Sequence, residues 1–209
     1  MKKILIGLVV VVIVGIVFVL SIGRAPKDVQ RAEINDSQDQ AQNSTTTTPV
    51  VFNENLQKSI EDFDLSKLNF KFTGYGPGKS HDGTFNGISI ANIEHNNDYI
   101  TKGTIKFFTE SIDTGIDKLD THLCAENFFD CAKYKEIQFT ITNVTRKSAT
   151  ALDVAGDLTM KGITKQVTFE VKQDGVKLSS DFILDVNQFG FTAPDIVDNE
   201  VRIQFDTAL

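Results

Sequence analysis

Apolar and polar residues alternate in short runs from residue 65 to the end of the chain, with turn residues between the runs. Period-two alternation places one face of a strand in a core and the other in water, so the pattern predicts antiparallel sheet. The runs cover residues 68–75, 84–93, 99–109, 136–146, 149–158, 166–173, 176–186 and 200–207. Eight strands of this length predict an all-β fold, namely a closed eight-stranded antiparallel barrel.

One connection between runs is a predicted tight turn, and four of the runs carry a clear row of apolar side chains that should face the core. The polar stretch KGITKQ follows Met160, and its Gly162 supplies a turn conformation that is closed to other residues. The predicted inward rows are Ile137, Phe139 and Ile141; Val167, Phe169 and Val171; Phe182, Leu184 and Val186; and Val201, Ile203 and Phe205.

Residues 113–134 break the alternation. Ile116, Leu119 and Leu123 recur there at helical spacing, which predicts a short helical insertion between the third and fourth strands. On a barrel, an insertion at this place lies most naturally across one mouth.

The N-terminus begins with an apolar segment. Twenty residues without a charge run from Ile4 to Gly23, enough for a helix of about 30 Å, which spans a bilayer core. A small-residue cleavage site is missing, so we interpret residues 1–23 as an uncleaved transmembrane anchor. Cleavage by a peptidase of another specificity is the alternative.

A polar segment separates this anchor from the domain. Residues 24–50 contain few large apolar side chains, which predicts a disordered linker. An amphipathic helix around Val29–Ile34 is the alternative. The remaining residues, 51–209, have the size of one domain with a substantial core.

Charge and motifs narrow the function. A net charge of −7 without a basic cluster argues against a nucleic-acid partner. The sequence contains no G-x-S-x-G, P-loop, C-x-x-C or glycine-rich dinucleotide turn, so we expect no enzyme and no cofactor. Sixteen phenylalanines and no tryptophan favour an apolar interior, which either lines a lipid cavity or fills the barrel.

Several motifs together resemble the YceI-like family. The matching stretches are GKSHDGTF, SIDTG, LDTHLCAENFFD, GDLTMKGITKQVTFEV, and FGF followed by NEVRIQF. Members of that family are lipocalin-like eight-stranded barrels, mostly secreted or periplasmic in bacteria, and some bind polyisoprenoid chains inside the barrel. The resemblance covers about residues 64–207. It implies a lipocalin-like barrel with an apolar ligand, an isoprenoid lipid or quinone.

The expected ligand contacts follow from this resemblance and the inward rows. They are His81, Phe85, Phe107, Leu119, His122, Phe128, Phe139, Leu158, Phe169, Phe182 and Leu184. His81 and His122 fall in the family-like motifs, with three roles open: bonds to buried backbone groups, contact with a headgroup, or metal binding. No spacing such as H-x-x-x-H supports a metal, and we predict none. The competing hypothesis is a ligand-free barrel that acts as an interaction module at the cell surface.

The family's usual location and the apolar run predict a single-pass protein of the cell membrane with its barrel on the extracytoplasmic side. In an oxidising compartment, Cys124 and Cys131 are expected to form a disulfide. A continuous helix would hold them about 10.5 Å apart, so the bond requires a break in the helix near Glu126 and Asn127. Two free thiols are the alternative, and the oligomeric state is left open.

Overall fold

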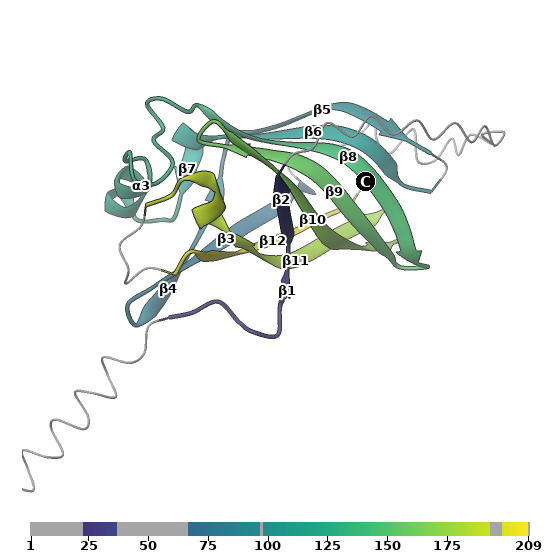
Figure 1. Ribbon diagram of the computed structural model, residues 1–209, viewed down its shortest axis with the longest axis horizontal. Coiled ribbons are helices and arrows are strands. Elements are labelled where there is room, and N and C mark those ends of the chain that lie inside the picture. Colours follow the sequence, from purple (N-terminus) through teal and green to yellow (C-terminus); the bar gives the residue numbers. More distant parts are fainter. Residues whose placement is uncertain (1–22, 37–66, 97, 193–197, 209) are drawn as a thin grey trace, which may run out of the picture.

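A computed structural model describes residues 23–36, 67–96, 98–192 and 198–208 of the 209-residue chain. Within these ranges the fold is all-β, with one α-helix beside a mostly antiparallel sheet that curls into a barrel (Figure 1). The strands are β1 Gln30–Arg31, β2 Glu33–Asp36, β3 Asn69–Gly76, β4 Lys79–Phe85, β5 Ile88–His95, β6 Ile100–Phe108, β7 Ile112–Asp113, β8 Glu136–Ser148, β9 Ala151–Met160, β10 Ile163–Asp174, β11 Lys177–Asp185 and β12 Glu200–Ala208. The helical elements are the 3-10 helices η2 Thr109–Ser111 and η3 Val186–Phe189 and the α-helix α3 Asp117–Leu123.

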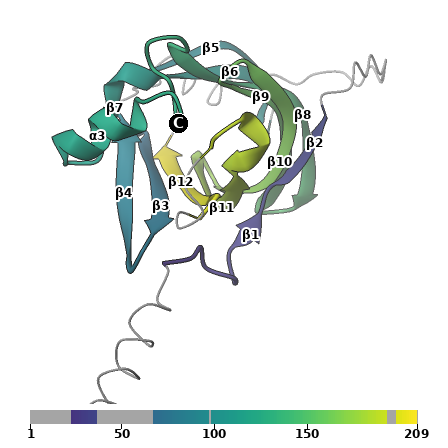
Figure 2. The ribbon, with the colours of Figure 1, turned by 60° about the vertical axis from the view of Figure 1, so that its left-hand side comes forward.

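Neighbouring strands follow the order β5-β6-β8-β9-β10-β11-β12-β3-β4-β7. β5, at one end of this path, follows β4 directly across Asn86 and Gly87. β7, at the other end, pairs with β4 and follows β6 through η2. The two ends of the path therefore meet at a corner of the sheet. Figure 2 shows the strands arranged around a common centre. The predicted all-β antiparallel fold is confirmed, and each of the eight predicted runs overlaps a strand.

The β9–β10 connection is the predicted tight turn. Met160 pairs with Ile163, and the two residues between them, Lys161 and Gly162, have φ values of 50° and 74°. Positive φ at both central residues matches the right-handed twist of a hairpin, and Gly162 adopts it without steric cost.

Strand register defines two ends of the barrel. β3 and β4 are joined where Gly76 pairs with Lys79, and we call this the hairpin end. β10 and β11 are joined at the opposite end, where Asp174 pairs with Lys177, and we call this the turn end. β12 runs from the hairpin end to the turn end. Its first residue, Glu200, pairs with Asp185 at the end of β11, and its last residue, Ala208, pairs with Lys177 at the start of β11.

β10 and β11 separate soon after the turn that joins them. In the described chain they pair directly at three positions, from Lys172 to Asp174, whereas β9 accompanies β10 from Ile163 to Lys172. We call the resulting gap the seam. Residues 23–36, which we call the strap, fill it: β2 pairs with β10 and β1 pairs with β11 (Figures 1 and 2).

The prediction of a disordered linker over residues 24–50 is therefore wrong for residues 24–36, and so is the alternative helix at Val29–Ile34. The reason is tertiary, because the open edges of β10 and β11 offer backbone partners that a local pattern does not reveal. The Ala32 amide, for example, donates to the Ile183 carbonyl at 2.9 Å. Ile183 is 1% exposed and packs with Ala25 and Tyr75 in a second apolar cluster outside the main core.

Two local predictions also need correction. β4 was missed because most of its residues are polar. It pairs with β3, where Gly83 lies opposite Phe72. A Cβ at position 83 would come within 2.4 Å of the Phe72 ring, so glycine allows this close approach. The predicted helical insertion lies in the expected place, but its α-helix is limited to Asp117–Leu123, and turns form most of the chain up to Lys135.

The predicted transmembrane segment, Ile4–Gly23, lies outside the described residues except for Gly23. In the part of the chain that the structure describes, no helix is long and apolar enough to cross a membrane. The amide of Gly23 donates to the Gly76 carbonyl at 3.0 Å, so the strap begins at the hairpin end (Figure 2). Residues 37–50, the rest of the predicted linker, also lie outside the described ranges.

Candidate functional site

The barrel contains an apolar cavity of about 440 Å³. Its lining extends from Gly76 and His81 at the hairpin end to Gln173 and Thr207 at the turn end. All four predicted inward rows line it, because alternation along a strand turns these side chains to one face. The side chains of the barrel therefore line its interior without filling it.

Every residue predicted to contact a ligand lies on this lining. The residues are His81 and Phe85 of β4, Phe107 of β6, Leu119 and His122 of α3, Phe128, Phe139 of β8, Leu158 of β9, Phe169 of β10, and Phe182 and Leu184 of β11. The structure thus brings together side chains from seven elements and one turn around a single cavity. Their contact with a ligand stays a prediction.

Phenylalanine rings shape the cavity. The rings of Phe169 and Phe182 stack at a centroid distance of 4.3 Å and an interplanar angle of 10°, which links β10 to β11 inside the barrel at the seam. Phe70 of β3 and Phe107 of β6, which are not neighbouring strands, approach to 4.5 Å. Each such pair contributes about 0.5–1.5 kcal/mol beyond the area it buries. The lining offers hydrophobic and dispersion contacts along most of its length.

Polar groups gather at the hairpin end of the lining. His81 reaches the cavity from β4, His122 from α3, and Thr114, Asp198 and Asn199 from connecting segments. The exposed His122 ring lies with its centroid 4.8 Å from the Phe128 ring. These groups can donate or accept hydrogen bonds at one end of an apolar chain. Among the described residues, no three of His, Cys, Asp and Glu gather to hold a metal ion.

A disulfide holds part of the lining in place. Cys124 and Cys131 are bonded, and α3 ends before the first of them, so the chain breaks where the bond requires it. The loop between the cysteines carries Phe128, which is 8% exposed, and Phe129, and both line the cavity. The crosslink therefore restrains two aromatic side chains of the site.

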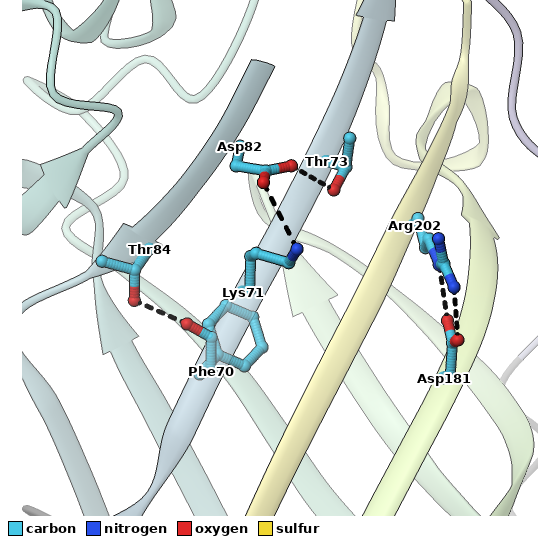
Figure 3. A network of polar contacts seen from close by, with 7 residues as sticks. All are labelled: Phe70, Lys71, Thr73, Asp82, Thr84, Asp181 and Arg202. Carbon is cyan, nitrogen blue, oxygen red and sulfur yellow. Dashed lines mark hydrogen bonds and ion pairs between the residues drawn. The ribbon is translucent and has the colours of Figure 1, made fainter. Parts of the chain in front are cut away.

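Charged residues on the same strands lie on the other face of the sheet (Figure 3). Asp82 accepts hydrogen bonds from Thr73 Oγ1 at 2.6 Å and from Lys71 Nζ at 3.3 Å, and the Thr73 bond is the main cause of its lowered pKa. Arg202 donates to both carboxylate oxygens of Asp181, at 2.7 and 2.6 Å, which lowers the pKa of Asp181. None of these five residues lines the cavity. Alternation keeps this network away from the apolar interior.

Some lining residues were missed at the sequence level. Phe70 and Phe72 alternate within the first predicted run, so the same inward-row argument finds them. Asp198 and Asn199 carry no such signal, because they lie just before β12 and outside the alternating runs.

Comparison with known proteins identifies the domain. The model of the YceI-like domain matches residues 59–209. The chain belongs to the YceI-like family. Proteins named YceI from Escherichia coli O6:H1 and Shigella flexneri are 35% and 34% identical to it over 119 residues, which is 57% of this chain. That match spans 58% of the length of these relatives.

Solved structures show the same YceI-like fold. BcnA of Burkholderia cenocepacia has a TM-score of 0.62 at 21% identity, over 71% of this chain and 99% of that one. A YceI protein of Campylobacter jejuni has a TM-score of 0.53 at 19% identity, over 61% and 84%. A polyisoprenoid-binding domain from Saccharophagus degradans, implicated in plant cell wall breakdown, has a TM-score of 0.52 at 12% identity, over 68% and 94%. The strap precedes the YceI-like match.

Proposed function

We propose that this protein is a lipid-binding protein that holds a long apolar chain, of the isoprenoid type, inside its YceI-like barrel. The cavity of about 440 Å³ carries the proposal, because an interior filled by its own side chains would favour a ligand-free interaction module. A further support is the shared fold with the Saccharophagus degradans domain, which is described as polyisoprenoid-binding.

The cavity volume limits the length of chain that it can enclose. A water-sized group occupies about 30 Å³, so the cavity accommodates about 15 non-hydrogen atoms, or about three isoprene units. Burial of one unit contributes on the order of 3 kcal/mol before the costs of association. Three enclosed units therefore contribute on the order of 9 kcal/mol before these costs. A longer lipid would leave its remaining units and its headgroup at a mouth, and His81 and His122 are our candidates for contact with that headgroup.

We further propose that the chain is anchored in the membrane by Ile4–Gly23, with the barrel on the extracytoplasmic side. The uncharged run is long enough to span a bilayer core. The Cys124–Cys131 disulfide supports the location, since disulfides persist mainly in oxidising compartments. Protease added to intact cells or spheroplasts should then cut the barrel away from its anchor, whereas protection until lysis would contradict this location.

Titration of the whole protein with isoprenoid alcohols and quinones of increasing length tests the lipid-binding proposal. Affinity should rise with each unit up to about three units and then level off, because further units lie outside the cavity. Affinity that does not depend on chain length would instead favour the ligand-free interaction module.

Three variants locate the binding. Phe169→Glu should abolish binding, because a carboxylate would be desolvated against hydrocarbon. Leu158→Trp should weaken it by filling the cavity without adding a charge. Phe108 is 42% exposed and does not line the cavity, so Phe108→Glu should bind as the wild type does. Thermal unfolding of all three variants separates a loss of binding from a loss of fold.

A further inference from the structure

The strap fixes the start of the described chain tightly to the hairpin end. The Gly23 amide donates to the Gly76 carbonyl at 3.0 Å, and a Cβ on Gly23 would lie 2.7 Å from the Lys79 carbonyl oxygen. Two residues later, Ala25 is 5% exposed, and its amide donates to Asp198 Oδ2 at 3.1 Å. The chain is therefore held at the point where its twenty-residue uncharged run ends.

The residues that hold the strap also line the cavity. Gly76 and Asp198 bond to the strap, Tyr75 packs against Ala25, and all three belong to the cavity lining. His81, the candidate headgroup contact, lines the cavity at the same end. The attachment point of the strap and the polar rim of the cavity thus coincide.

We infer that the strap holds the hairpin end of the barrel against the membrane surface, so that a lipid passes between the bilayer and the cavity without crossing bulk water. The inference rests on the proposed function, because it requires Ile4–Gly23 to anchor the chain. Because Gly23 is bonded to Gly76, no spacer would separate a membrane helix that ends at Gly23 from the hairpin end. The cavity rim then lies beside the headgroup layer.

Charge at the hairpin end suits this surface. Arg24 and Lys79 are exposed beside the Gly23 contact, although the chain as a whole has a net charge of −7. Basic side chains at the surface of a leaflet that contains anionic lipids are attracted to its headgroups.

The turn end is the competing surface. A groove of about 870 Å³ lies there and shares Gln173, Leu178 and Thr207 with the cavity lining. Four lysines line it: Lys67, Lys147, Lys172 and Lys177. Lys147 pairs with Asp153 at 3.5 Å and with Glu170 at 2.9 Å, so part of this positive charge is already compensated. The hairpin end, by contrast, carries the exposed Arg24 and Lys79 and is also attached to the uncharged run Ile4–Gly23.

Site-specific quenching distinguishes the two ends. Two variants each place one thiol at an exposed position: Lys79→Cys at the hairpin end and Val176→Cys at the turn end. Lys79 is exposed, and Val176 is 45% exposed. Each full-length variant is labelled with a fluorophore without reduction of the native disulfide, and is reconstituted into vesicles that contain headgroup-labelled quencher lipid. We expect several-fold stronger quenching at position 79 than at position 176.

A spacer variant supplies the control. A flexible Gly/Ser segment of about 20 residues inserted between Ile22 and Gly23 has an end-to-end distance of about 25 Å and leaves the strap intact. Quenching at position 79 should then fall to the level at position 176, and lipid transfer from vesicle to barrel should slow.

The outcomes separate the inference from the proposed function. Protein that floats with the vesicles but shows equal quenching at both positions, or stronger quenching at position 176, overturns the inference and leaves the anchor in place. Protein that does not float with the vesicles overturns the anchor and the inference with it. Lipid binding by the same sample, measured separately, then decides the remaining part of the proposed function.

Discussion

The wall formed by β9 and β10 and the seam between β10 and β11 close the same barrel in different ways. In the wall, pairing is continuous from Ile163 opposite Met160 to Lys172 opposite Ala151. At the seam, β10 and β11 pair directly at three positions, and the strap supplies the other partners. The wall is a local hairpin, whereas the seam joins groups such as Gln30 and Glu170, which are 140 positions apart in the sequence.

This difference indicates how the YceI-like domain is completed in this chain. An unpaired strand edge invites association with other chains, so an uncovered β10 would be a liability. The strap, which lies before the YceI-like match, covers that edge and adds Ala32 and Ile34 to the main core. We expect the wall to open only on global unfolding and the seam to open locally at a lower free energy.

The largest effect is expected in the wall. A Cβ at Gly156 would lie 2.5 Å from the Phe139 ring and 2.6 Å from the Thr140 carbonyl oxygen, which the paired backbone cannot relieve. Gly156→Ala should therefore lower the free energy of unfolding by about 1–3 kcal/mol. Gly103 also pairs with β8, but its Cβ would meet only Ile141 at 3.7 Å, so Gly103→Ala should change stability by less than about 1 kcal/mol. Equal losses in denaturant melts of the two variants would contradict this account of the wall.

A smaller and more local effect is expected at the seam. Ile34→Ala removes about three partly buried carbons, which should weaken strap docking by about 1–2 kcal/mol. Hydrogen exchange of the Ala32 amide, which donates to Ile183, should then accelerate by about tenfold, while amides of β9 keep their wild-type rates. Glu33→Ala changes an exposed neighbour and serves as the control. Faster exchange throughout β9 would show that the seam and the wall open together.

Gln30 tests the side-chain bonds that bridge the seam. Its amide group accepts from the Glu170 amide at 3.2 Å and donates to the Glu170 carbonyl at 3.1 Å. Gln30→Ala should cost about 1 kcal/mol of strap docking. The Glu170 amide should then exchange faster, and Gln30→Glu, which keeps an acceptor but loses the donor, should have an intermediate effect. An unchanged exchange rate at Glu170 would assign strap docking to apolar contacts alone.

The smallest expected effect concerns the ion pair between β11 and β12. The bonds from Arg202 lower the pKa of Asp181 in the folded state. The pair therefore stabilises the fold at pH values above the unfolded-state pKa of about 3.9. This contribution is lost as the pH falls through the lower pKa of the folded state. The pair is partly exposed, so its contribution should be at most about 1 kcal/mol. Asp181→Asn should flatten stability against pH below about pH 4. A wild-type slope in that variant would place the acid sensitivity elsewhere.

The strands and the inward face of the site were predictable from the sequence, because alternation is a local property. Phe169 and Leu184 were placed correctly on the lining by this argument alone. The Gly162 turn was predictable for the same reason, since its conformation is set by neighbouring residues.

The strap and the size of the cavity were not predictable in this way. Residues 30–36 are mostly polar, and β1 and β2 form there only because β10 and β11 leave edges free. One signal was present, since Ile183 between Phe182 and Leu184 breaks the alternation and indicates a strand buried on both faces. Whether the rings fill or line a barrel depends on how the whole interior packs, so periodicity could not decide it.

Native mass spectrometry of the protein extracted gently from its own membrane tests most directly whether the cavity holds a lipid. The wild-type chain should carry one apolar lipid as an added mass, and Phe108→Glu should carry the same mass. Phe169→Glu should appear without it, because the charged side chain lies on the cavity lining. A wild-type spectrum with only the mass of the unliganded chain, or an added mass that persists in folded Phe169→Glu, would contradict lipid binding in the barrel.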